Sequence, residues 1–283
     1  MVLKFHTSYA KIHSMKELTL NDVFDILPER KKDSNKGSYG RLLSVVGCKY
    51  YRGAAVLSSM GALRTGVGIL TVCSTEEVIQ AVATALPEAT FLPREELDIT
   101  YIPKVTALLC GCGLGKDERV ADIVKNCSVP MILDADGLNN ITAEDIPEDT
   151  VITPHIGEFS RLTGISIGEI KSNPERYARA FADKYNVTVV LKDYETVIAS
   201  PEKETAISRF GNPGLARGGS GDVLAGMIAS FRAQGMSSYD AAVCGVVLHG
   251  ASADRCAKRL SIQTMLPHDI INDLTDIFKE RGR

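Results

Sequence analysis

From residue 41 onward, the sequence alternates short, almost wholly apolar runs with stretches rich in helix-forming residues. Continuous apolar strands separated by helices are typical of a parallel sheet that is covered by helices on both faces. The sequence therefore predicts an α/β fold with a mainly parallel central sheet. The runs that we interpret as strands are 42–46, 69–73, 105–110, 131–134, a run ending at 151–152, 187–191, and a short antiparallel addition at 197–199.

The first 36 residues differ from the rest of the chain. Thr19, with Asp22 three residues later, is a plausible N-cap for a short helix through Leu27, and a charged connector follows. No internal repeat or linker interrupts the later pattern, so we expect a helix and connector at 1–36 and a single domain at 37–283. The helices expected in that domain are 54–64, one beginning near Thr75, 223–233, 238–258 and one from Pro267 or His268 to Lys279.

Composition and charge argue against several classes of protein. Hydrophobic residues make up 45% and charged residues 24% of the chain, as in soluble globular proteins, and the formal net charge is −3. A protein with this charge has no overall positive potential that would attract nucleic acid or an anionic membrane. No apolar run approaches the ~18 residues of a membrane span. The seven cysteines are odd in number and scattered, which favours a reducing compartment. We therefore expect a cytoplasmic protein that binds small anions through local loops.

The strongest functional motif is segment 211–222, with the sequence GNPGLARGGSGD. Its glycines, including Gly219 and Gly221, let the backbone approach a ligand closely. The helix expected to follow presents unpaired N–H groups and a partial positive charge, which suit a phosphate. Asp222 would lie in the first helical turn, where a carboxylate can act as general base for a hydroxyl that attacks phosphorus. The alternative, that Asp222 only caps the helix, is disfavoured by the length of the glycine-rich segment.

Two further segments follow predicted strands. His155 lies after the strand that ends at 152 and before a helix that starts near Gly157. A single histidine is more often structural than catalytic, but a strand-to-helix loop favours contact with a ligand. Segment 192–196, Lys-Asp-Tyr-Glu-Thr, connects two apolar strands and could contact ribose or phosphate, although an ordinary hairpin turn would look the same.

Other loops also follow predicted strands, and ligands of open α/β sheets bind beyond the carboxyl ends of the strands. Segment 111–115 has the spacing Gly-x-Gly-x-Gly, not the Gly-x-Gly-x-x-Gly of the dinucleotide fingerprint, which argues against a Rossmann dehydrogenase. Residues 50–52, Tyr-Tyr-Arg, either reach a ligand or are ordinary surface residues. Asp134 and Asp136 could bind magnesium through water, or could simply cap and turn the chain.

Taken together, these segments resemble the ADP- or ATP-dependent NAD(P)H-hydrate dehydratases, a family of the ribokinase-like superfamily. The matching segments are 36–40, 52–66, 111–115, 133–139, 153–155, 192–196 and 212–226. They occur in the family's order and span almost everything from residue 36 onward. The resemblance implies a ribokinase-like fold and a stand-alone dehydratase, because residues 1–36 are too few for the epimerase domain of many relatives.

The resemblance implies an enzyme that converts (6S)-NAD(P)H hydrate to NAD(P)H at the cost of ADP or ATP. Asp222 would be catalytic, removing the proton of the C6 hydroxyl so that its oxygen attacks the terminal phosphate. The residues that would contact the hydrated dinucleotide are Ala55, Gly115, His155 and Asp222. Those that would contact the adenine nucleotide are Lys192, Asp193, Tyr194, Glu195, Thr196, Gly219 and Gly221.

The resemblance also implies Mg²⁺ as cofactor, ADP in preference to ATP, assembly into a homo-oligomer (a tetramer), and NAD(P)H-hydrate epimerase as functional partner. It assigns no metal ligands. Cys112 and Ile156 stand where the family usually has proline, which bears on loop geometry. Two alternatives are a ribokinase-like kinase of a thiazole or pyrimidine alcohol and a nucleotide sensor without turnover. The loop 111–115 and His155 argue against the kinase, and Asp222 argues against the sensor.

Overall fold

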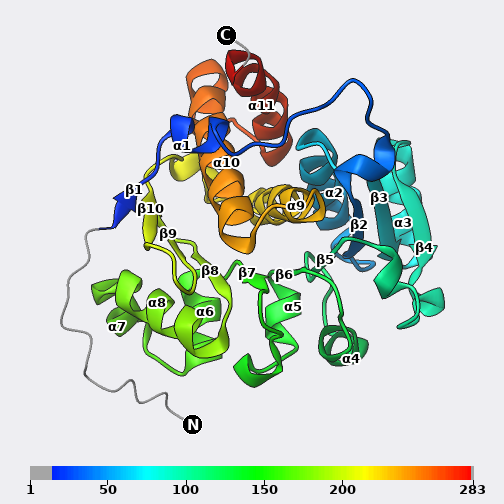
Figure 1. Ribbon diagram of the computed structural model, residues 1–283, viewed down its shortest axis with the longest axis horizontal. Helices are drawn as coiled ribbons and strands as arrows, with labels where there is room; N and C mark the ends of the chain where they lie inside the picture. The colour runs from blue at the N-terminus through cyan, green and yellow to red at the C-terminus, as the bar shows by residue number, and fades with distance from the viewer. Residues whose placement is uncertain (1–14, 282–283) are drawn as a thin grey trace.

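The computed structural model describes residues 15–281, and the sequence expectations for residues 1–14 and 282–283 lie outside this part. Its centre is one ten-stranded sheet in the order β1-β10-β9-β8-β7-β6-β5-β2-β3-β4 (Figure 1). The strands are β1 (Lys16–Glu17), β2 (Arg41–Val45), β3 (Ile69–Ser74), β4 (Thr90–Pro93), β5 (Ala107–Cys110), β6 (Met131–Leu133), β7 (Val151–Ile152), β8 (Thr188–Leu191), β9 (Thr196–Ala199) and β10 (Ala206–Ser208).

Every neighbouring pair from β8 to β4 is parallel, whereas β9 pairs antiparallel with both β8 and β10. The predicted parallel sheet and its antiparallel extension at β9 are therefore confirmed. Strands β1, β4 and β10 were not predicted from the sequence. They lacked a signal because β1 and β10 have two and three residues, and β4 is only partly buried and ends in a proline.

Helices cover both faces of the sheet, with α2, α9, α10 and α11 on one face and α4 to α8 on the other (Figure 1). The α-helices are α1 (Leu20–Phe24), α2 (Arg52–Arg64), α3 (Glu76–Ala85), α4 (Arg119–Lys125), α5 (Asp136–Asn139), α6 (Ile156–Thr163), α7 (Ile167–Ser172), α8 (Pro174–Tyr185), α9 (Ser220–Ala233), α10 (Ser238–Leu260) and α11 (Pro267–Arg281). Short 3₁₀ helices are η1 (Lys36–Tyr39), η2 (Arg94–Glu96), η3 (Ile102–Lys104), η4 (Ala143–Asp145) and η5 (Pro213–Leu215).

Alternate side chains of the central strands form two hydrophobic cores. Leu42, Leu109 and Ile132 belong to the core shared with α2, α9 and α10, whereas Leu43 and Leu108 belong to the core on the opposite face. All five are fully buried. Burial on both faces explains why these strands are continuous apolar runs in the sequence.

Two glycines bring α2 and α9 into backbone contact. A Cβ atom on Gly61 would lie 2.5 Å from the carbonyl oxygen of Val223, and one on Gly226 would overlap the carbonyl oxygen of Ser58. Larger residues would therefore push the helices apart. Helix α9 also packs on β5 and β6, so this contact fixes the helix over the centre of the sheet.

Several predicted boundaries differ from the structure by two residues or more, and three of them bear on the argument. Helix α9 begins at Ser220 rather than at residue 223, because Gly219 takes a left-handed conformation with φ of 98° and the helix starts directly after it. The strand predicted at 105–110 begins only at Ala107, since η3 precedes it. The N-cap at Thr19 is confirmed, but α1 ends at Phe24 and not at Leu27, and residues 25–27 form turns in which Ile26 and Leu27 both donate to the Val23 carbonyl oxygen.

The remaining sequence expectations concern organisation. All seven cysteines are free thiols. Within residues 15–281, no helix combines the length and the apolar character that crossing a bilayer requires. Strand β1 pairs with β10, and Val23 of α1 is buried in the core shared with α10. The division of the chain at residue 36 stays a prediction.

Candidate active site

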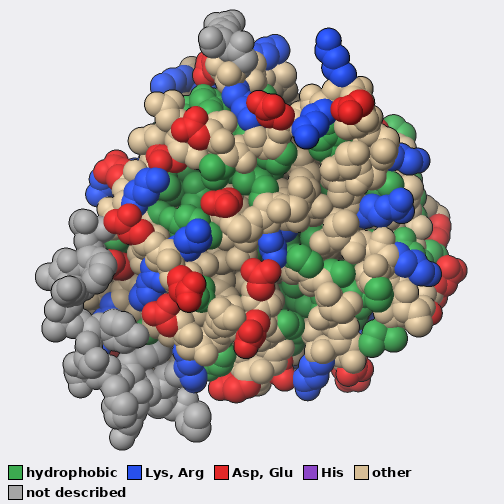
Figure 2. All heavy atoms as spheres, viewed as in Figure 1, with side chains coloured by type: hydrophobic (Ala, Val, Ile, Leu, Met, Phe, Trp, Pro, Cys, Tyr) green, Lys and Arg blue, Asp and Glu red, His purple; other side chains and the backbone are tan. Residues whose placement is uncertain are grey.

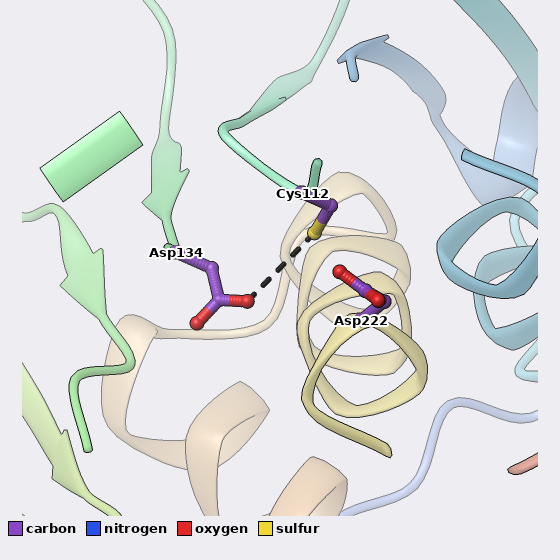
Figure 3. A group of neighbouring side chains, drawn as sticks. All are labelled: Cys112, Asp134 and Asp222. Carbon is purple, nitrogen blue, oxygen red and sulfur yellow. Dashed lines mark hydrogen bonds between the residues drawn. The ribbon is translucent and has the colours of Figure 1, made fainter. Parts of the chain in front are cut away.

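The carboxyl ends of four adjacent parallel strands, β5 to β8, carry polar residues toward one edge of the sheet. Cys112 follows β5, Asp134 follows β6, Thr153 follows β7 and Lys192 follows β8. Because parallel strands end at the same edge, residues far apart in the sequence meet there, as expected for ligand sites of open α/β sheets. The N-terminus of α9 reaches the same edge (Figure 3).

Segment 211–222 forms the glycine-rich loop and the first turn of α9. Gly219 needs its positive φ, and a Cβ atom there would overlap the side chain of Leu57. Among the described residues, no side chain caps the start of the helix. Its first N–H groups and partial positive charge therefore suit an anion, as predicted from the sequence.

A buried ion pair lies beneath this helix start. The Nζ atom of Lys192 lies 2.9 Å from Asp134 Oδ1, and the Thr153 hydroxyl donates to the same oxygen at 2.6 Å. Burial lowers the pKa of Lys192, but the Asp134 carboxylate outweighs it, so the pKa is raised above its usual value. Lys192 is therefore charged at the base of the site.

Asp222 faces this pair from the first turn of α9. Acceptor and donor atoms of Cys112, Asp134 and Asp222 lie within 4.8 Å of one another, and the Cys112 thiol donates to Asp134 Oδ2 at 3.8 Å (Figure 3). Burial, together with the charge of Asp134, raises the pKa of Asp222 from 3.8 to about 6. A carboxylate with this pKa is ionised at neutral pH and remains basic enough to accept a proton from a substrate.

The loop 111–115 is fixed from the other side by α5. Gly115 N–H donates to Asp136 Oδ2 at 2.7 Å, and Asn140 donates to the Gly115 carbonyl oxygen at 3.0 Å. Gly113 has φ of 61°, and a Cβ atom there would lie 3.0 Å from the carbonyl oxygen of Tyr51. The glycines thus serve close packing between two loops of the site, a role that their spacing alone did not indicate.

Ala55 lies in the first turns of α2 and has no exposed surface, so neither its side chain nor its backbone is open to a ligand in this structure. The neighbouring loop is held by Arg94, whose guanidinium is buried and donates to the carbonyl oxygens of Val46 and Gly47 at 2.8 and 2.7 Å. Sequence reasoning missed Arg94, because it follows β4, which was itself not predicted.

His155 is the N-cap of α6. Its Nδ1 atom accepts the N–H groups of Gly157 and Glu158 at 3.0 and 3.2 Å, which requires the imidazole to be unprotonated at Nδ1. The side chain is 62% exposed, and its Nε2 atom lies 3.5 Å from a Glu158 oxygen. His155 also forms an isolated parallel bridge with Lys192, which places it beside the ion pair at the sheet edge.

Segment 192–196 comprises the turn between β8 and β9 and the first residue of β9, and its Lys192 reaches Asp134 in the site. Tyr194 is 87% exposed, and Glu195 pairs with Arg209 at 2.7 Å. Asp193 lies 3.8 Å from Lys171 on α7. The structure therefore brings Lys192, Gly219, Gly221 and Asp222 together and leaves residues 193–196 on the rim.

His249 of α10, which sequence reasoning also missed, supports the start of α9. It is buried, its Nε2 atom has no hydrogen-bond partner among the described residues, and it interacts with the backbone of Ser220. Burial and the nearby Lys192 charge lower the pKa of His249 to about 4, so the imidazole is neutral. It lies in the middle of a long helix, where its sequence gives no functional signal.

The parallel sheet, the glycine-rich loop and the carboxylate in the following helical turn together define a ribokinase-like protein. Among solved structures, a ribokinase-like superfamily protein from Enterococcus faecalis V583 is 27% identical, with a TM-score of 0.86 over 94% of this chain and 96% of that chain. This agreement confirms the predicted ribokinase-like fold.

The chain belongs to the NAD(P)H-hydrate dehydratase family, whose model matches residues 42–276. The ADP-dependent (S)-NAD(P)H-hydrate dehydratase of Bacillus subtilis (strain 168) is 35% identical over 259 residues, or 89% of this chain and 94% of that protein. The crystal structure of the ADP/ATP-dependent enzyme from Bacillus subtilis, co-crystallized with ATP/Mg²⁺, has a TM-score of 0.86 and 33% identity over 95% and 99% of the two chains. The predicted family is confirmed.

A second kind of relative is longer than this chain. The bifunctional NAD(P)H-hydrate repair enzyme of Escherichia coli (strain K12) is 37% identical over 259 residues, which are 89% of this chain but only 50% of that protein. The matched half corresponds to the ribokinase-like domain described above.

Proposed function

We propose that this protein catalyses the ADP- or ATP-dependent dehydration of (6S)-NAD(P)H hydrate to NAD(P)H, a hydro-lyase reaction that repairs damaged nicotinamide nucleotides. The observation that carries the proposal is the position of Asp222, a half-buried carboxylate beside an uncapped helix N-terminus. Membership of the dehydratase family supports the choice of substrate.

Asp222 acts as general base in this proposal. It takes the proton from the C6 hydroxyl of the hydrated ring, and the hydroxyl oxygen then attacks the terminal phosphorus of ADP or ATP, releasing AMP or ADP. The new phosphate ester leaves C6 with its bonding electrons while a proton leaves C5, which restores the ring double bond. Phosphorylation is needed because hydroxide is a poor leaving group and phosphate is a good one.

The start of α9 stabilises the charge of the transferring phosphoryl group. The N–H groups of the turn that contains Gly221 and Asp222 lie at the positive end of the helix dipole. A Cβ atom on Gly221 would lie 3.4 Å from Lys192 Nζ, so the ammonium group is close to the same turn. Phosphate oxygens placed there would meet both backbone donors and a positive charge.

The two substrates occupy opposite sides of Asp222 in this proposal. The hydrated dinucleotide lies over the first turns of α2, which contain Ala55, and beside Gly115 and His155. The adenine nucleotide lies along segment 192–196 and the glycines 219 and 221. Asp193 and Tyr194 of this segment are exposed, which suits recognition of a ribose or a base at the entrance to the site.

Asp134 fits a magnesium ion bound with the nucleotide. Its Oδ1 atom accepts from Thr153 and Lys192, whereas Oδ2 faces Asp222 and, within residues 15–281, receives only the weak thiol donor of Cys112. Carboxylate oxygens combined with water and phosphate are the ligands that Mg²⁺ prefers, and a thiol is a poor one. When bound, the ion would neutralise charge on the phosphates.

We further propose a cytoplasmic homo-oligomer, a tetramer, that works with a separate NAD(P)H-hydrate epimerase. The bifunctional name of the Escherichia coli relative supports an epimerase partner. Sedimentation equilibrium on the purified protein tests the assembly: a tetrameric mass is expected, and a monomeric mass would contradict it.

The reaction is tested by incubating the protein with (6S)-NADH hydrate, Mg²⁺ and either ADP or ATP. The dihydronicotinamide absorbance should return, with stoichiometric formation of AMP or ADP and phosphate. The nucleotide that gives the higher kcat/KM identifies the preferred co-substrate. No return of absorbance with either nucleotide would contradict the dehydratase proposal.

The same assay separates the alternatives. A stable phosphorylated alcohol, formed from a thiazole or pyrimidine substrate without loss of water, would indicate a kinase. Tight nucleotide binding without any turnover would indicate a sensor.

A further inference from the structure

Helix α10 holds the start of the glycine-rich loop through one carboxylate. Asp254 Oδ2 accepts the backbone N–H of Gly211 at 3.0 Å, and its Oδ1 atom accepts the side-chain amide of Asn212 at 3.1 Å. Asn212 Oδ1 in turn accepts the backbone N–H of Gly214 at 3.0 Å. A continuous chain of hydrogen bonds thus runs from α10 through two side chains into the loop.

The hydrogen bonds require aspartate at position 254 and asparagine at position 212. Asp254 receives two N–H donors, so it must be an acceptor on both oxygens. Asn212 must donate to Asp254 with Nδ2 and accept from Gly214 with Oδ1. In Asp254→Asn, the new NH₂ group would face one of the two N–H donors that Asp254 now accepts. In Asn212→Asp, two carboxylates would face each other.

The loop also lies directly on the backbone of α10. A Cβ atom on Gly250, one turn before Asp254, would lie 2.6 Å from the carbonyl oxygen of Phe210. A Cβ atom on Gly214 would lie 2.9 Å from the carbonyl oxygen of Ile262, in the turn after α10. The loop cannot shift toward α10, so the carboxylate determines how its first residues are oriented.

We infer that Asp254 is a positioning residue, which holds the glycine-rich loop through Asn212 in the conformation that binds nucleotide phosphate. The inference rests on the proposed function, since that function places the phosphates at this loop. Asp254 itself contacts only the loop among the groups assigned to the site. Its effect on phosphate binding therefore passes through the backbone of residues 211–219.

The hydrogen bonds of Asp254 and its negative charge have opposite effects on the affinity for ADP. Asp254 is a negative charge near a loop that binds an anion, so its removal would strengthen ADP binding if charge alone mattered. Loss of the hydrogen-bond chain should weaken binding instead. Breaking one hydrogen bond to a charged group leaves a partly buried donor unpaired, which corresponds to a loss of affinity on the order of tenfold.

The test swaps the residue types at positions 254 and 212. Asp254→Asn and Asn212→Asp each interrupt the series of hydrogen bonds, whereas the double variant restores it. In the double variant the amide introduced at position 254 donates to the carboxylate introduced at position 212, and that carboxylate still accepts the N–H of Gly214. Asp276→Asn, at an exposed aspartate of α11 that pairs with Lys279, is the matched control for the loss of charge. ADP binding is measured by isothermal titration calorimetry, with amide hydrogen exchange of residues 211–219 and circular dichroism on each variant.

Both single variants should bind ADP about tenfold more weakly, with faster exchange in the loop and a native spectrum, and the double variant should return to within about threefold of wild type. Single variants that bind ADP as wild type does, or a folded double variant that stays weak, would overturn the positioning role. A wild-type protein that binds no ADP would overturn the proposed nucleotide site itself. Amide hydrogen exchange of residues 211–219 in the single variants would then still show whether the hydrogen bonds of Asp254 and Asn212 order the loop.

Discussion

At the scale of single residues, the pKa of Asp222 results from opposing influences. Burial and the charge of Asp134 raise its pKa, while the Cys112 thiol and the charge of Lys192 lower it. These groups come from three strand ends, β5, β6 and β8, and meet at the first turn of α9. The balance leaves a carboxylate that changes its protonation state near pH 6.

Replacement of Asp222 by asparagine removes the proposed base while keeping its size. We expect kcat for the dehydration to fall by about 10³-fold, because general base catalysis contributes roughly that amount. Nucleotide binding depends on the helix N-terminus and should change little. Single-turnover kinetics and calorimetry with ADP check the two parts, and loss of both would indicate that Asp222 is only a structural cap.

Protonation of Asp222 should determine how the reaction depends on pH. The base acts only when it is ionised, so kcat/KM should decrease about tenfold per pH unit below about pH 6 and level off above it. Lys192→Met removes a charge that lowers the pKa of Asp222, so the midpoint should move to higher pH. Lys279→Met, at an exposed position of α11, is the control. An acid limb that stays in place in Lys192→Met would contradict this electrostatic coupling.

The raised pKa of Asp222 also predicts how stability depends on pH. The folded state binds the proton more tightly than the unfolded state, so this contribution to stability is fully present below about pH 3.8 and is lost as the pH rises through about 6. The difference corresponds to at most about 3 kcal/mol at neutral pH. Asp222→Asn should therefore raise the free energy of unfolding at pH 8 more than at pH 4, measured by urea denaturation. An equal effect at both values would contradict the raised pKa.

At the scale of elements, the contact between α2 and α9 positions the catalytic turn. Gly226 permits this contact, since a Cβ atom there would overlap the carbonyl oxygen of Ser58. Gly226→Ala should lower the free energy of unfolding by about 3 kcal/mol, because the helices cannot separate without disturbing the core. It should also lower kcat, since α9 carries Asp222.

The control for this substitution is Gly168→Ala on α7. That position has open space around it, so alanine there should be neutral or stabilising by about 0.5 kcal/mol. Thermal denaturation and the dehydration assay compare the two variants. Equal stability of the Gly226 and Gly168 variants would show that the close helix contact is not needed.

At the scale of the whole molecule, the net charge of −3 does not attract a nucleotide, so phosphate binding must come from the local loop and helix start. ADP at a hundred times its Kd should stabilise the folded protein by about 2.7 kcal/mol, which raises Tm by roughly 5 °C. Adenosine at the same concentration lacks the phosphates and should have a much smaller effect. Equal shifts with ADP and adenosine would contradict phosphate binding at residues 211–222.

The sequence by itself determined the fold class, most strands and the central motif. Strands buried on both faces, such as β2 and β5, are unbroken apolar runs, so their pattern is local and can be recognised without a structure. The motif 211–222 is also local, because the loop, the helix start and Asp222 are consecutive. The predictions for Lys192 and His155 identified strand ends correctly but not the partners of these residues.

Only the tertiary structure decided which of these residues meet. The Asp134–Lys192 pair joins residues 58 positions apart, and Asp254 anchors Gly211 from 43 positions further along the chain. Such contacts leave no periodicity or spacing in the sequence, because they depend on the order of strands in the sheet and on how α10 crosses the loop. The pKa of Asp222 depends on the same contacts, since burial and neighbouring charge arise only when β5, β6, β8 and α9 converge.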